Sequence, residues 1–200
     1  QLTKKAPSTM WRYGPLLPIM EPKYISPLPI GWTPLIEAER LEALIVQKDS
    51  KIQSVADLKG KRVVLNKGSN VHYLLLKVLE AHGLKLSDIE VVYLPPSDAR
   101  AAFEKGAVDA WVIWDPFLSA AEHQIGARVL ADGEKLVNNY QFYLADRKFA
   151  EAHPQVIQAV VNELNLSTQW VEAHQDEAAQ LLEKPTGLDF KVLRTSISRM

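Results

Sequence analysis

Residues 65–83, LNKGSNVHYLLLKVLEAHG, contain the end of a strand, a turn and a complete helix. An apolar run ends at Asn66, and Lys67-Gly68-Ser69 forms a polar turn. From Asn70 onward apolar side chains recur at helical spacing, until Gly83 supplies the residue that most easily adopts the left-handed conformation at a helix end. A strand followed directly by an amphipathic helix is the repeating unit of α/β sheets.

The flanking sequence repeats this alternation. A short capped helical turn is expected at 54–58. Strands are expected at 44–46, 62–66, 90–94, 108–113, 128–130 and 141–145, and helices at 70–82, 97–105 and 117–124. This order is typical of a mainly parallel α/β sheet. Further helices are expected at 156–174, at 176–183 before a break at 184–187, and from Asp189 onward.

Proline usage separates the N-terminal stretch from the remainder of the chain. Seven of the twelve prolines lie within residues 1–34, and proline both fixes φ and removes a backbone donor. From proline usage and the order of the expected elements, we divide the chain into an irregular proline-rich segment at 1–34, an α/β lobe at 35–145 and a helical segment at 146–200.

Composition excludes several classes of function. The net charge is -1, so no basic field favours nucleic acid as a partner. Cysteine is absent, which removes disulfides, thiolate metal sites and cysteine nucleophiles. No apolar run approaches the ~20 residues of a membrane span, and no signal peptide is visible in this chain.

The turn before residue 70 has two interpretations. The Ser69 hydroxyl can cap the first turn of the helix, a structural role. Alternatively, the unpaired N–H groups and the positive end of the helix dipole can bind an anion there. In that case Gly68 permits close approach, Lys67 adds positive charge, and Asn70 and His72 face the same space.

A second cluster lies in Trp114-Asp115-Pro116, at the carboxyl end of the strand expected at 108–113. Ligands of open α/β sheets bind beyond the carboxyl ends of strands, so this cluster and Ser69 can converge. Core packing is the alternative role for Trp114, and capping of the following helix is the favoured role for Asp115.

No catalytic constellation is present. The five histidines are dispersed, without metal-ligand spacing, and the Ser69–His72 pair has neither a nucleophile elbow nor a third orienting group. We therefore expect a binding protein rather than an enzyme, without metal or cofactor.

Four segments together resemble the periplasmic aliphatic sulfonate-binding proteins, the solute receptors of ABC importers. The resemblance extends over roughly 42–186 and rests on SVADLKGKRV at 54–63, KGS at 67–69 with His72, LPPSDARAAF at 94–103, and GAVDAW at 106–111 with WDPF at 114–117.

The resemblance implies a periplasmic binding protein-like type II fold, in which two α/β lobes joined by crossing strands close over a ligand. This chain would supply the complete second lobe, with 44–47 and 141–145 as the crossing strands. The expected ligand site comprises Lys67, Gly68, Ser69, Asn70, His72, Trp114 and Asp115. The expected partners are an alkanesulfonate and a membrane permease, with the receptor a monomer in the periplasm.

Residues 1–34 do not resemble the half lobe with which that family begins. The first lobe is therefore expected to be incomplete, leaving one wall of a two-walled cleft that binds alkanesulfonates weakly. Three alternatives remain open: a taurine or nitrate receptor, an enzyme of the same fold that makes a thiamine pyrimidine precursor, and an effector-sensing lobe of a transcription regulator. The second of these is disfavoured, because the cysteine-rich site of that enzyme has no counterpart here.

Overall fold

The computed structural model describes residues 41–137 and 143–199 of the chain. They belong to two compact units. One contains the described residues from 41 to 137 together with 174–199, and the other contains 143–173. The expected proline-rich segment lies outside the described residues, as do the first two residues of the strand expected at 141–145. The remaining three residues of that strand, 143–145, have no regular secondary structure.

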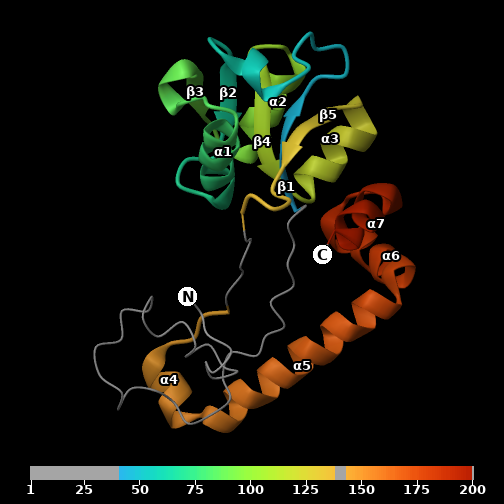
Figure 1. Cartoon of the computed structure of the whole chain (residues 1–200). Helices are drawn as coiled ribbons and strands as arrows, with labels where there is room; N and C mark the ends of the chain where they lie inside the picture. The colour runs from blue at the N-terminus through green and yellow to red at the C-terminus, as the bar shows by residue number, and fades with distance from the viewer. Residues whose placement is uncertain (1–40, 138–142, 200) are drawn as a thin grey trace. The chain divides into compact units, whose positions relative to one another are not determined.

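The larger unit is built on a five-stranded sheet of order β3-β2-β4-β1-β5 (Figure 1). The strands are β1 Glu42–Val46, β2 Arg62–Leu65, β3 Glu90–Tyr93, β4 Ala110–Trp114 and β5 Arg128–Asp132. β2 pairs in parallel with β3 and β4, whereas β1 pairs antiparallel with both β4 and β5. Four strands therefore share one direction, which confirms the mainly parallel sheet, and the expected crossing strand β1 runs against them.

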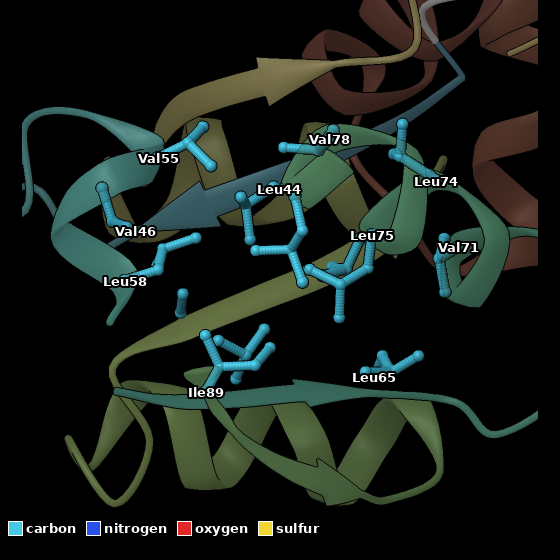
Figure 2. Close-up of a cluster of buried hydrophobic side chains, with 14 of the residues drawn as sticks. Leu44, Val46, Val55, Leu58, Leu65, Val71, Leu74, Leu75, Val78 and Ile89 are labelled. Atoms are coloured by element: carbon cyan, nitrogen blue, oxygen red, sulfur yellow. The ribbon is translucent and has the colours of Figure 1, made fainter. Parts of the chain in front are cut away.

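One face of this sheet is covered by α1, Asn70–Ala81. Five of its apolar side chains recur at helical spacing and are fully buried in one cluster with Leu44, Val46 and Leu65 (Figure 2). The buried residues of the helix are Val71, Leu74, Leu75, Val78 and Leu79. The helix ends where Gly83 takes a φ of +71°, as its sequence predicted.

The other face is covered by α2, Pro96–Glu104, and α3, Phe117–Ile125. Phe103 and Leu118 from these helices pack with Trp111 and Ile113 of β4. Val112 points into the cluster under α1, so the expected alternation of side chains along β4 is confirmed.

Short 3-10 helices connect these elements, η3 at Val55–Leu58 and η4 at Leu86–Asp88. The unit is completed by α6, Gln175–Thr186, and α7, Phe190–Ser198, which Asp189 caps by accepting a hydrogen bond from the Val192 amide. The expected break at 184–187 is wrong. The helix includes Pro185 and ends at Gly187, because a proline in the last turn disturbs few helical hydrogen bonds.

The second unit contains α4, Arg147–Ala152, and α5, Pro154–Ala173. α4 was not anticipated, and Asp146 caps it by accepting a hydrogen bond from the Phe149 amide. Among the described residues, no helix combines the length and apolar character needed to cross a bilayer.

Candidate functional site

The candidate residues gather at one edge of the sheet. β3, β2 and β4 are parallel, so Tyr93, Leu65 and Trp114, their last residues, end at this edge. β1 runs the other way, so its first residue, Glu42, lies there too and is in register with Trp114. The convergence predicted from the sequence is thus present in the structure.

The first turn of α1 is not capped by the Ser69 hydroxyl. Ser69 occupies the N-cap position, but its Oγ donates to the carbonyl of Asn66 at 2.8 Å and makes no capping hydrogen bond. The Ser69 carbonyl accepts from the His72 amide at 3.1 Å. Because its hydroxyl is turned back into the loop, the Ser69 side chain leaves the amides of Asn70 and Val71 uncapped, so these two groups can donate to an anion.

His72 folds back over this turn. The Gly68 amide donates to His72 Nδ1 at 3.4 Å, and Gly68 itself has a φ of +73°. The His72 ring meets Tyr93 edge-on, with centroids 5.7 Å apart, and Lys67 Nζ lies 5.4 Å from the centre of the Tyr93 ring. Tyr93 therefore orders two basic side chains beside the turn.

Asn70 connects the helix to the central strand. Its side-chain Nδ2 donates to Oε2 of Glu42, a residue that is only 1% exposed. Desolvation by burial raises the pKa of Glu42 from 4.5 to about 7. The site thus includes a buried carboxyl group directly beside the first residue of α1.

Trp114 and Asp115 have different environments. Trp114 is half-buried, packs against both apolar clusters and meets Phe117 edge-on, with centroids 6.5 Å apart. The Asp115 carboxylate accepts from the amide of Ser119 at 2.9 Å and pairs with Arg199 Nη1 at 3.2 Å. Its side chain is 1% exposed, so this carboxylate stabilises the start of α3 and the loop after Trp114.

Two residues at this edge were not anticipated. Tyr93 is the last residue of its strand, a position from which it could have been found. Glu42 precedes an apolar run and gives no local sign of burial. Its position depends on the antiparallel pairing of β1 with β4, which joins segments about 70 residues apart.

The arrangement suits binding of an oxyanion by N–H and hydroxyl groups. Because the Ser69 hydroxyl donates to Asn66 rather than to His72, these two residues do not form a nucleophile–base pair. The described residues contain no group of three or more histidine, aspartate or glutamate side chains able to bind a metal.

Comparisons of the sequence and of the structure both find proteins that bind aliphatic sulfonates. The sequence model of a family described as "NMT1/THI5 like" matches residues 32–178. Over 154 residues the chain is 45% identical to an aliphatic sulfonates-binding protein of Escherichia coli (strain K12), which covers 77% of this chain and 48% of the relative. It is also 34% identical over 122 residues to the taurine-binding periplasmic protein of E. coli, covering 59% of this chain and 37% of that protein.

Among solved structures, the alkanesulfonate-binding protein SsuA from Xanthomonas axonopodis pv. citri, bound to MOPS, superposes with a TM-score of 0.75 at 40% identity. The alignment covers 81% of this chain and 56% of that one. The chain therefore spans about half the length of the curated aliphatic sulfonate-binding relative that it matches.

Proposed function

We propose that this chain, which belongs to the NMT1/THI5-like family, is the ligand-binding lobe of a receptor for aliphatic sulfonates. The observation that supports this most directly is its 45% identity to an aliphatic sulfonates-binding protein. In this proposal the protein binds its ligand without chemical change, outside the cytoplasm, as a monomer that delivers the ligand to the permease of an ABC importer.

The sulfonate head binds at the turn formed by Lys67, Gly68 and Ser69. A sulfonate is a weak base that offers no proton, so it is best bound by fixed N–H and hydroxyl donors rather than by an acid or base. The amides of Asn70 and Val71 in the first turn of α1 provide such donors, since the Ser69 side chain does not cap them. Rotation of the Ser69 hydroxyl away from Asn66 would add one more.

The side chains around the turn complete the proposed site. Lys67, in contact with Tyr93, adds positive charge, and the His72 ring, which also contacts Tyr93, adds a further polar group through Nε2. Trp114 provides apolar surface for the alkyl tail, and Asp115 keeps that loop in position through Ser119 and Arg199.

Taurine is the second candidate ligand, because of the 34% identity to a taurine-binding protein. A taurine receptor must recognise an ammonium group as well as a sulfonate. Comparing methanesulfonate, butanesulfonate and taurine in one binding experiment therefore separates the two candidates.

NMR titration of the ¹⁵N-labelled chain tests the proposal, because amide chemical shifts report weak binding as well as tight binding. We expect methanesulfonate and butanesulfonate to shift the amides of residues 67–72 and the Trp114 indole, whereas chloride at matched ionic strength does not. Ser69→Ala and Trp114→Ala should weaken these shifts. Ser54→Ala, at the N-cap of η3, should leave them unchanged. Absence of any sulfonate-specific shift at 67–72 would refute the proposal.

A further inference from the structure

Glu42 is a buried acid for which the described part of the chain supplies no cationic partner. Within residues 41–137 and 143–199, its carboxyl group accepts one hydrogen bond, from the Asn70 side chain, and no lysine, arginine or histidine there forms an ion pair with it. Asp115, which follows the Trp114 opposite Glu42, pairs with Arg199, and Arg199 also pairs with Glu122. Burying a carboxyl group without a cation costs free energy of folding, and this one lies at the edge of the proposed binding site. Its position therefore calls for a functional explanation.

We propose, building on the proposed function, that Glu42 is a specificity-determining residue that makes the site select singly charged sulfonates over doubly charged oxyanions such as sulfate. Both ligands present three or more oxygens on a tetrahedral sulfur, so shape alone separates them poorly. Charge separates them directly.

The physical argument follows from position. The N-terminus of α1 and Lys67 attract a dianion about twice as strongly as a monoanion, so by themselves they would favour sulfate. Glu42 lies one hydrogen bond from Asn70, the first residue of that helix. Its repulsion also doubles for a dianion, which opposes this preference. Since Glu42 is 1% exposed, salt screens the repulsion poorly.

The selectivity should depend on pH, because burial raises the pKa of Glu42 to about 7. Above that pH the carboxylate is charged and repels the dianion, and below it the neutral acid does not. The other ionisable groups on the elements around the Glu42 end of β1 include His72 and Lys67 beside α1, Asp115 after β4, and Asp132 of β5, opposite Ala43; Arg128 of β5 lies at the far end of β1, opposite Val46. His72 lies beside the same turn, so it requires its own control.

Affinities for methanesulfonate and sulfate, measured by NMR titration of the full chain, test this inference. Neither ligand changes its charge between pH 6 and 8.5. At pH 8.5 the wild-type chain should prefer methanesulfonate, and Glu42→Gln should shift the affinity ratio toward sulfate by on the order of tenfold. Glutamine retains the oxygen that accepts from Asn70, so the variant changes charge with little change in shape.

Two controls make the result specific. Glu90→Gln removes the same charge from the exposed start of β3, at the opposite edge of the sheet, and should leave the ratio unchanged. In His72→Gln the ratio of methanesulfonate affinity to sulfate affinity should still fall when the pH is lowered from 8.5 to 6. In Glu42→Gln most of this pH dependence of the ratio should be lost.

The outcomes separate this inference from the proposed function. If methanesulfonate binds at residues 67–72 and Glu42→Gln leaves the ratio within twofold of wild type, the inference is overturned and the proposed function stands. If the wild-type chain binds neither anion there, the proposed function fails and the inference fails with it.

Discussion

Replacing Glu42 by glutamine should stabilise the sheet unit, and the gain should depend on pH. An acid whose pKa is higher in the folded than in the unfolded chain destabilises the fold once it must ionise there. For Glu42 burial raises the pKa from 4.5 to about 7. The penalty is therefore absent below pH 4.5, grows between 4.5 and 7, and is complete above 7.

The size of the effect follows from the two pKa values. The difference between 4.5 and about 7, at roughly 1.4 kcal/mol per pH unit, amounts to about 3 kcal/mol at pH 8. At pH 5 the same relation leaves about 1 kcal/mol. Glutamine cannot ionise and retains the acceptor for Asn70, so Glu42→Gln should exceed the wild type in unfolding free energy by these amounts.

Urea denaturation at pH 5 and pH 8, followed by the amide signals of β4, measures both values within the sheet unit itself. Glu90→Gln, on an exposed position of β3, should show little change in stability at either pH. An equal difference between Glu42→Gln and wild type at both pH values would refute the reasoning, because it would show that Glu42 does not titrate differently in the folded chain.

Three further substitutions test other parts of the structure. Gly68→Ala and Gly83→Ala both place a side chain on left-handed backbone, with no atom within 4 Å of the new Cβ. Each substitution should therefore lower the unfolding free energy by about 1 kcal/mol. Only Gly68→Ala should also weaken sulfonate binding in the NMR titration. Arg199→Met should lower the unfolding free energy measured by urea denaturation by about 3 kcal/mol, because it leaves the buried Asp115 carboxylate without its cation. Arg194→Met breaks an exposed ion pair of α7 and should lower it by at most about 1 kcal/mol. Phe103→Ala should cost about 4 kcal/mol by opening a cavity against Trp111, and a loss below 1 kcal/mol would contradict the packing seen there.

The elements of the sheet unit could be predicted because their signals are local. Helix α1 begins after Ser69 and ends before Gly83 because apolar spacing, turn residues and a left-handed glycine lie within one short segment. The sequence at 108–113 predicted β4 two residues too early, since Asp109 accepts hydrogen bonds from Arg62 before the strand begins. A partner 47 residues away leaves no mark in the local pattern.

The candidate site was predictable only in part. The turn at 67–69 and Trp114 could be found because each follows a strand whose end is recognisable. Capping of the following helix was the favoured role for Asp115, and in the structure its carboxylate accepts from the Ser119 amide in the first turn of α3 and also forms an ion pair with Arg199. The partner in that ion pair lies 84 residues further along the chain.

The division of the chain also depended on tertiary contacts. The sequence indicated one helical segment at 146–200, whereas the structure groups 174–199 with the sheet and 143–173 separately. Amphipathic helices show that they have an apolar face, but the same face can pack against any apolar surface of suitable shape. The sequence alone therefore could not assign α6 and α7 to the sheet unit.

By itself, the sequence determined the order of strands and helices within the sheet unit, the position of the turn after β2 and the resemblance to sulfonate receptors. Only the tertiary structure decided that β1 runs against its neighbours, that Glu42 is thereby buried between Asn70 and Trp114, and that Arg199 pairs with Asp115. The physical reason is that periodicity and turn chemistry act over a few neighbouring residues. Strand order and burial instead depend on which distant surfaces exclude water from each other.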